Sequence, residues 1–230
     1  MADRPYTLLS CSMSLDGYLD STSVRRLALS NEADFDRVDA VRAGCDAILV
    51  GATTIRHDDP RLIVKSAARQ ADRLARGLTS SPAKVTLTRS GELDPDAQFF
   101  RTGEADRLVY CPSAVAVTLR PRLGSLATVV DAGPKVDLHW MSEHLSERGI
   151  NRLMVEGGST INTAFLTEDL VDELHLVVAP FFVGDPLARR FVEAGEFPWS
   201  AQRRARLAEV RPIGDVVLLR YALSTRFGES

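Results

Sequence analysis

The sequence predicts a single-domain α/β protein with a mixed, mostly parallel sheet flanked by helices, and three observations support this prediction. Short apolar runs alternate along the chain with segments of helical periodicity, which is the pattern of strands joined by crossover helices. The chain closes with two strand-like runs, 206–210 and 216–223, and Pro212 and Gly214 between them favour an antiparallel hairpin. No repeat or linker divides the 230 residues, so we expect one domain over residues 1–230.

The first expected elements are a strand, a helix and a second strand. Residues 6–13 form an apolar run that ends in a turn at 14–17. Ser30 is the expected N-cap of a helix that ends at Gly44, because serine caps helices and glycine closes them. The apolar positions of this helix are Phe35, Val38 and Val41. The uninterrupted apolar run 47–50 predicts a strand buried on both faces.

The same alternation continues to the C-terminus. Asp137 is the expected cap of a helix that buries Leu138, Met141 and Leu145 and ends at Gly149, and another helix is expected over 159–166. The segment 65–81 is rich in Ala, Arg and Ser, and its local structure stays open. Further strands are expected at 84–88, 108–111, 127–130, 152–155 and 174–178.

Composition and charge exclude several classes of protein. Apolar residues make up 45% and charged residues 26%, which are the values of a globular chain. Lys and Arg number 28 against 31 Asp and Glu, so no basic excess indicates a nucleic-acid partner. The three cysteines are scattered and form no CxxC, so we expect them buried and reduced, and we expect no metal site. No signal peptide and no bilayer-length apolar run are present, so we expect a cytoplasmic protein without a membrane partner.

The most informative motif joins the strand 152–155 to the helix 159–166. Glu156 is followed by Gly157 and Gly158, so the backbone can turn sharply and approach a ligand closely at this point. One interpretation is a site for the pyrophosphate of a dinucleotide at the start of a helix, and the other is a tight turn that needs glycine for its geometry alone. Glu156 favours the first interpretation, because an acid at the carboxyl end of a strand faces the usual ligand crevice of an α/β sheet.

A second motif follows the buried strand 47–50 and covers residues 51–62. Its Thr and Asp side chains are suited to binding ribose hydroxyls or an amide, whereas Asp59-Pro60 is also an ordinary turn signature. These residues alone favour neither the ligand site nor the ordinary turn.

Taken together, the motifs resemble the pyrimidine reductases of riboflavin biosynthesis, whose fold is like that of dihydrofolate reductase. The resemblance covers about residues 6–223 and depends on the order and spacing of its stretches. The matching stretches are 12–17, 29–35 with Arg42-Ala43, 46–51, Thr54, 58–62, 155–158, 170–176, Ala179-Pro180 and Gly184.

This resemblance implies hydride transfer from NADPH to C1′ of a ribosylamino-pyrimidine 5′-phosphate, with the chemistry supplied by the nicotinamide. It makes Glu156 and Asp58 the candidate catalytic residues. Cofactor contacts are implied for Ser12, Thr54, Asp58, Ser90, Gly157, Gly158, Ser159, Thr160, Ile161 and Asn162. Substrate contacts are implied for Arg42, Arg61, Leu62, Lys65 and Glu156. The family is usually dimeric, so we expect a homodimer, with the apolar run 174–178 near its interface.

Four positions bear on the substrate. Lys65 stands where many bacterial relatives carry an Arg for the substrate phosphate, and Lys is the pattern of the branch that acts before deamination. Ser10 replaces a Lys or Asn near the nicotinamide, and Arg89 precedes Ser90 where an Asp is common. The segment 25–27 lacks the polar signature of bifunctional relatives. Two alternatives stay open: a dihydrofolate, pteridine or specialised-metabolite reductase of the same fold, and a nucleotide-binding module without catalysis.

Overall fold

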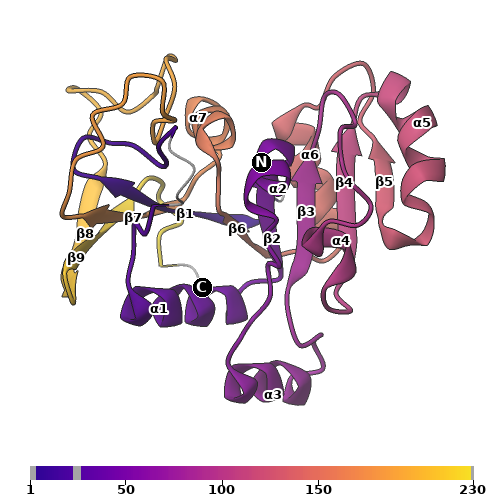
Figure 1. Ribbon diagram of the computed structural model, residues 1–230, viewed down its shortest axis with the longest axis horizontal. Helices are drawn as coiled ribbons and strands as arrows, with labels where there is room; N and C mark the ends of the chain where they lie inside the picture. Colours follow the sequence, from indigo (N-terminus) through magenta and orange to yellow (C-terminus); the bar gives the residue numbers. More distant parts are fainter. Residues whose placement is uncertain (1–3, 23–26, 229–230) are drawn as a thin grey trace. The chain divides into compact units, whose positions relative to one another are not determined.

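The computed structural model describes residues 4–22 and 27–228 (Figure 1). These residues form two compact units. The first comprises residues 4–5 and 39–154, and the second comprises residues 6–22, 27–38 and 155–228. The single domain expected over residues 1–230 stays a prediction. Most of the segment 25–27 lies outside the described residues.

The first unit is built on a sheet whose strands follow the order β5-β4-β3-β2-β6 (Figure 1). From β2 to β5, each strand pairs in parallel with its neighbour. Every residue of β2 is buried, as expected of a central strand with an uninterrupted apolar run. The strands confirm the predicted runs, and their bounds are β2 (Ala47–Gly51), β3 (Ala83–Leu87), β4 (Arg107–Cys111), β5 (Thr128–Asp131) and β6 (Arg152–Val155).

The helices of the first unit include several that the sequence analysis did not predict. The predicted cap of α6 is confirmed, since the Trp140 N–H donates to the Asp137 carboxylate at 3.0 Å. The undecided segment contains α3, which Ser66 caps. The unpredicted helices are α2, α4 and α5. The bounds are α2 (Ala52–Asp58), α3 (Ala67–Ala75), α4 (Gln98–Arg101), α5 (Ser113–Leu123) and α6 (Leu138–Glu147), with a 3₁₀ turn at Gly124–Leu126.

The second unit has a mixed sheet in the order β1-β7-β9-β8. β1 and β7 are parallel, and β9 is antiparallel to both β7 and β8. The predicted C-terminal hairpin is therefore confirmed, and Gly214 lies in its turn with φ of 61°. One helix, α7 (Ser159–Thr167), follows the glycine motif. The strand bounds are β1 (Tyr6–Ser14), β7 (Glu173–Ala179), β8 (Arg206–Ile213) and β9 (Val216–Ala222).

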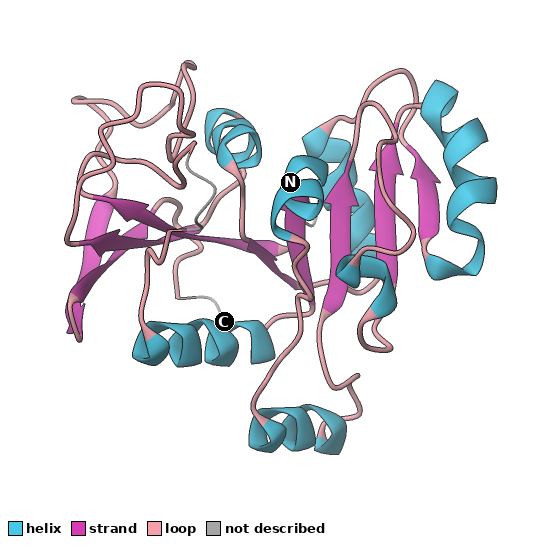
Figure 2. Ribbon diagram, viewed as in Figure 1, coloured by secondary structure: helices cyan, strands magenta, loops and turns pink. Residues whose placement is uncertain are grey.

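β7 is an interior strand, because it pairs with β1 on one edge and with β9 on the other. Six of its seven residues are buried. The long connection from β7 to β8 contains no helix or strand other than a bridge between Tyr18 and Arg190 (Figure 2). The run 174–178 therefore offers neither a free edge nor an exposed face within the second unit.

The helix α1 (Glu32–Ala43) begins in the second unit and ends in the first. The prediction that Ser30 caps it is wrong, because the Asp34 N–H donates to the side chain of Asn31 at 3.0 Å. The side-chain NH₂ of Asn31 also donates to the carbonyl of Ile213 at 2.7 Å. Serine has no NH₂ group, so it could not make this bond while its oxygen caps the helix in the same way. Phe35, expected among the apolar positions of the helix, is 54% exposed.

Each unit buries its own apolar core. The first unit buries two basic side chains, Arg73 and Lys84, and Nζ of Lys84 donates to the carbonyl oxygens of Phe99 and Thr102. Burial lowers the pKa of Lys84 to about 8. All three cysteines are free thiols; Cys45 and Cys111 are buried as predicted, whereas the prediction is wrong for Cys11, which is half-buried. Within residues 4–22 and 27–228, no helix combines the length and hydrophobicity needed to cross a membrane.

Candidate functional site

The glycine motif connects β6 to α7 in a conformation that requires glycine. Gly157 has a φ of 86°, which side chains disfavour, and its peptide bond to Gly158 is cis. A Cβ at Gly157 would lie 3.0 Å from Oδ1 of Asn162. The motif therefore packs directly against a side chain of the first turns of α7. Glu156, at the end of β6, is half-buried.

The start of α7 contains two buried polar atoms that lack a hydrogen-bond partner among the described residues. They are the Ser159 hydroxyl and Oδ1 of Asn162, and both residues are buried. A buried polar atom without a partner costs about 1–3 kcal/mol, so such atoms at one helix start indicate a missing partner. The first N–H groups of a helix also lack intrahelical acceptors, which makes this point suitable for an anion.

The rest of this turn already has partners within the second unit. The Thr160 hydroxyl donates to the carboxylate of Glu193 at 2.7 Å, and the Asn162 amide nitrogen donates to the carbonyl of Phe191 at 3.0 Å. The Glu193 N–H donates to the Thr163 hydroxyl at 2.8 Å. The connection from β7 to β8 is thus fastened to α7, and of the two predicted phosphate-binding hydroxyls only that of Ser159 remains without a partner.

β1 carries the remaining predicted residues of the second unit. Ser10 is buried and aligns with His175 of β7, and Ser12 aligns with Val177. Since side chains alternate along a strand, Ser10 and Ser12 lie on the face opposite to Cys11. Cys11 lies 3.8 Å from the amide nitrogen of Asn162, and burial raises the pKa of its thiol to about 12.

In the first unit, the motif 51–62 forms α2 and the irregular segment behind it. Thr54 is half-buried, whereas Asp58 is exposed at the last position of the helix. Asp59 follows with φ of 43° and closes α2 in a left-handed conformation. Asp59-Pro60 therefore marks the end of α2, as the turn interpretation predicted. The ligand interpretation of Thr54 and Asp58 stays a prediction.

The predicted substrate residues of the first unit lie on α1 and on the irregular segment 61–66 before α3. Leu62 is 2% exposed with φ of 48°, and Arg61 and Lys65 on either side of it are exposed. Arg42 of α1 donates to the carbonyl of Ile63 at 3.2 Å. The structure thus brings four predicted residues, Arg42, Arg61, Leu62 and Lys65, to one short segment.

Ser90 and Arg89 follow β3, and both side chains are exposed. The turn that carries them is closed by the Gly91 N–H, which donates to the Thr88 hydroxyl at 3.0 Å, and Gly91 has φ of 72°. The Ser90 hydroxyl accepts from the Glu92 N–H at 3.4 Å.

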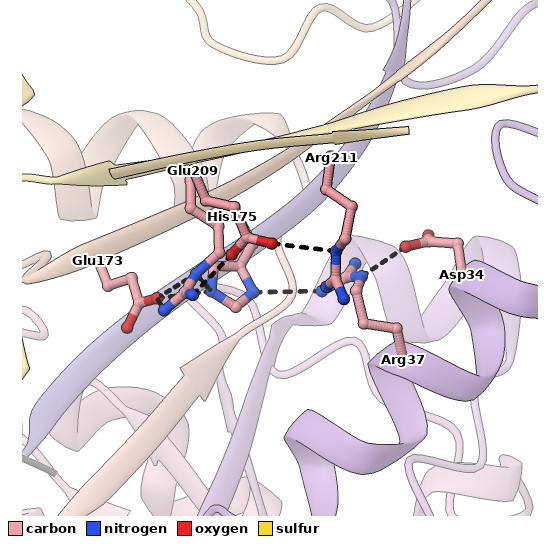
Figure 3. Close-up of polar contacts among 7 residues, drawn as sticks. Asp34, Arg37, Glu173, His175, Glu209 and Arg211 are labelled. Atoms are coloured by element: carbon pink, nitrogen blue, oxygen red, sulfur yellow. Dashed lines mark hydrogen bonds and ion pairs between the residues drawn. The ribbon is translucent and has the colours of Figure 1, made fainter. Parts of the chain in front are cut away.

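A cluster of charged side chains in the second unit was not anticipated from the sequence (Figure 3). Its centre is His175 of β7, which contacts the carboxylate of Glu173 at 2.7 Å and the guanidinium of Arg37 at 3.2 Å. Arg37 is also paired with Asp34 at 2.6 Å. Arg220 joins Glu173 to Glu209, and Arg211 contacts Glu209 at 3.0 Å. Each charged residue of the cluster is paired with at least one residue of opposite charge. Such pairing leaves no charge for a ligand and indicates a structural role.

Both ring nitrogens of His175 lie beside charged groups. Arg37 donates to Nδ1, while Nε2 lies 2.7 Å from the Glu173 carboxylate and 3.1 Å from Nε of Arg220, which is also a donor. Burial lowers the pKa of His175, and the nearby cations Arg37 and Arg220 lower it further, although Glu173 opposes them. Burial opposes ionisation of Glu173, but bonds from His175, Arg220 and Tyr6 hold its pKa at about 2. The histidine is therefore neutral and the carboxylate ionised at neutral pH.

Comparison with known proteins identifies the class. A dihydrofolate reductase from Enterococcus faecalis superposes with a TM-score of 0.52 over 94% of this chain and 95% of that chain, at 10% identity, and so shows the fold. RibD of Acinetobacter baumannii superposes with a TM-score of 0.78 at 27% identity, over 96% of this chain and 58% of that chain. The predicted dihydrofolate reductase-like fold is confirmed.

The sequence relationships are closer. Residues 5–219 match the RibD C-terminal domain family. A 2,5-diamino-6-ribosylamino-4(3H)-pyrimidinone 5′-phosphate reductase of Methanothermobacter thermautotrophicus is 34% identical over 222 residues, which cover 96% of this chain and 99% of that relative. The fold and these relationships define an oxidoreductase with a nicotinamide cofactor and a small-molecule substrate. The chain belongs to the RibD C-terminal domain family. The resemblance stated from the sequence is thereby confirmed.

Proposed function

We propose that the protein is an NADPH-dependent reductase that transfers a hydride to C1′ of a ribosylamino-pyrimidine 5′-phosphate in riboflavin biosynthesis. The observation that carries the proposal is the start of α7. There, the buried hydroxyl of Ser159, which has no partner among the described residues, lies close in sequence to Gly157, where an added Cβ would lie only 3.0 Å from Asn162. The named relative supports the choice of substrate.

The residues of the second unit fit the phosphates of the cofactor. The Ser159 hydroxyl is a donor, and the free N–H groups at the start of α7 are further donors to an anion. Gly157 and Gly158 lack the side chains that would hold a ligand away from the backbone. When it is bound, NADPH supplies the hydride. Ser12, Thr160, Ile161 and Asn162 are assigned to the same cofactor, as are Thr54, Asp58 and Ser90 of the first unit.

The substrate roles follow from the charge and hydrogen-bonding capacity of each residue. The Glu156 carboxylate accepts hydrogen bonds from the amino and N–H groups of the pyrimidine. Lys65 and Arg61 offer exposed cations to the 5′-phosphate, and Arg42 and Leu62 shape the segment that carries them. Glu156 and Asp58 are the carboxylates assigned to the catalytic steps, where they hold or accept a proton.

A titration and a rate measurement test this function. NADPH fluorescence should change on addition of the protein, and NADPH should be oxidised when the ribosylamino-pyrimidine 5′-phosphate is added. Glu156→Gln should lower kcat/KM about 10- to 100-fold, the worth of a hydrogen bond to a charged group, while the NADPH Kd stays within twofold. Glu147→Gln, the same change at an exposed position at the end of α6, is the control. An equal loss of NADPH affinity would count against the assigned role of Glu156.

One observation supports a second candidate, a nucleotide-binding module without catalysis. By the family resemblance, Ser10 stands near the nicotinamide, where relatives usually carry Lys or Asn, so the polar group closest to the chemistry has changed. Tight NADPH binding without oxidation by any pyrimidine phosphate, dihydrofolate or pterin would favour that candidate. Oxidation with dihydrofolate or a pterin alone would instead favour the other reductase of this fold.

We further propose that the protein acts in the cytoplasm as a homodimer. β8 supports a dimer, since it is an edge strand with Leu207 and Val210 half exposed. Analytical ultracentrifugation tests the dimer, and a monomer at micromolar concentration would contradict it.

A further inference from the structure

Side chains from other parts of the first unit bond to the backbone of the irregular segment 61–66. The Val64 N–H donates to the Ser81 hydroxyl at 3.0 Å, and the Val64 carbonyl accepts from the side chain of Gln70 at 2.7 Å. The Ile63 carbonyl accepts from Arg42. Since buried backbone groups need partners, these bonds determine the path of the chain up to Lys65.

A single carboxylate completes this set. Asp39 of α1, which is 5% exposed, accepts the Lys65 N–H on Oδ1 and the Ser66 N–H on Oδ2, the latter at 3.1 Å. The Arg69 guanidinium donates to Oδ2 at 2.9 Å. Burial opposes ionisation of Asp39, but these donors hold its pKa below the usual range. The carboxylate is therefore ionised at neutral pH, and both of its oxygens are occupied.

Two basic residues bond to this carboxylate, but only one of them does so through its charged group. Arg69 forms an ion pair with Asp39, so its charge is compensated. The ammonium of Lys65 is exposed and has no hydrogen-bond or ion-pair partner within the described part of the chain. Asp39 thus fixes the backbone of Lys65 without using its charge, which stays available for an anion.

We propose that Asp39 is a positioning residue that holds Lys65 ready for the anionic group of the substrate. The proposal rests on the proposed function, in which that group is the 5′-phosphate. Because the backbone of Lys65 is already fixed, less conformational entropy is lost when the phosphate binds. The expected benefit is therefore a higher affinity for the phosphate. Loss of Asp39 should therefore act through Lys65 and on the phosphate alone.

The test compares Asp39→Asn with wild type, using the phosphorylated substrate and its dephosphorylated analogue. The amide keeps the shape but presents an NH₂ group to one of the two backbone donors. We expect the KM for the phosphorylated substrate to rise about tenfold, with kcat and the KM of the analogue within twofold. Asp39→Glu, which keeps the charge, should restore part of the loss. A parallel change for both substrates would overturn the proposal.

Two controls separate positioning from general stability. Asp46 also accepts two backbone N–H groups, those of Asn151 and Arg152, each at 2.9 Å, but away from the segment 61–66 in sequence and in contacts. Asp46→Asn should lower the melting temperature without changing the ratio of the two KM values. In a Lys65→Ala background, Asp39→Asn should add less than a twofold effect, and full additivity would contradict action through Lys65.

A binding measurement keeps this inference distinct from the proposed function. If the wild type oxidises no NADPH with the pyrimidine, the proposed function fails, and calorimetric titration with ribose 5-phosphate and with ribose then decides on Asp39. Wild type should bind only the phosphate ester, and Asp39→Asn should bind it about tenfold more weakly. Equal affinity of both proteins, or no binding to either, would refute the role of Asp39.

Discussion

The segment 61–66 of the first unit and the start of α7 in the second unit handle their polar groups in opposite ways. In the segment, side chains of Arg42, Ser81, Gln70 and Asp39 occupy the backbone groups. At α7, the buried Ser159 hydroxyl and Asn162 Oδ1 lack partners among the described residues. The backbone groups of the first region already have partners within the protein, whereas the two buried atoms of the second region do not. If the proposed function is correct, the substrate segment is preorganised, and cofactor binding gives these buried atoms the partners that they lack.

The largest expected effect comes from adding a side chain to the glycine motif, where we propose that the cofactor binds. Gly157→Ala should weaken NADPH binding at least about 100-fold, because its φ of 86° disfavours a side chain and the new Cβ would lie 3.0 Å from Asn162. Gly133→Ala is the matched control, with φ of 77° and open space around it. Fluorescence titration measures both. Similar losses in the two variants would mean that backbone strain, and not the packing against α7, determines the effect.

Two serine-to-alanine substitutions test the contrast between the partnered segment 61–66 and the unpartnered start of α7. Ser81→Ala leaves the buried Val64 N–H without an acceptor and should destabilise the protein by about 1–3 kcal/mol. Ser159→Ala removes a hydroxyl that has no partner, so the protein without cofactor should be equally or more stable. NADPH binding to Ser159→Ala should nevertheless weaken about tenfold, and binding to Ser81→Ala should not. Urea unfolding with and without NADPH measures both quantities, and a destabilised Ser159→Ala without cofactor would break the contrast.

The smallest expected effect concerns the cluster around His175, a second region whose groups are fully partnered (Figure 3). The pKa of His175 is lowered from 6.5 in the folded state, so the unfolded chain binds more protons as the pH falls through 6.5. Stability should therefore fall on acidification below pH 6.5. His175→Gln should make this fall shallower.

The measurement is the free energy of unfolding in urea from pH 7.5 to 5.5. His144, whose pKa is also lowered, is present in both proteins and cancels in the comparison. An unchanged slope in His175→Gln would show that His175 is not held neutral by its surroundings.

The sequence predicted those features that depend on local pattern. Uninterrupted apolar runs located β2 and β6, and the Asp137 cap located α6, because burial and capping act over a few residues. The cap of α1 was misplaced by one residue. Ser30 and Asn31 both suit a cap, and the choice depends on the bond from Asn31 to Ile213, which is distant in sequence. The helices α2 and α5 follow strands or turns without a local signal strong enough to separate them from loops.

The proposed site could be predicted only in part, for the same reason. The glycine motif and the cations of the segment 61–66 were recognised from their order along the chain. Asp39 was not, because an acid within a helix is typical of an exposed face, and its role depends on bonds to residues 26 and 27 positions further on. The sequence also could not show that the Ser159 hydroxyl lacks a partner, because this depends on which atoms are buried in the folded chain.

Amide hydrogen exchange with and without NADPH tests the contrast between the two regions most directly. The amides of residues 64–66 should be protected before NADPH is added and should change little afterwards, because Ser81 and Asp39 already accept them. The amides of residues 159–161 should exchange fast without NADPH and gain protection with it. Fast exchange at 64–66 that slows on NADPH binding, together with no change at 159–161, would contradict the account.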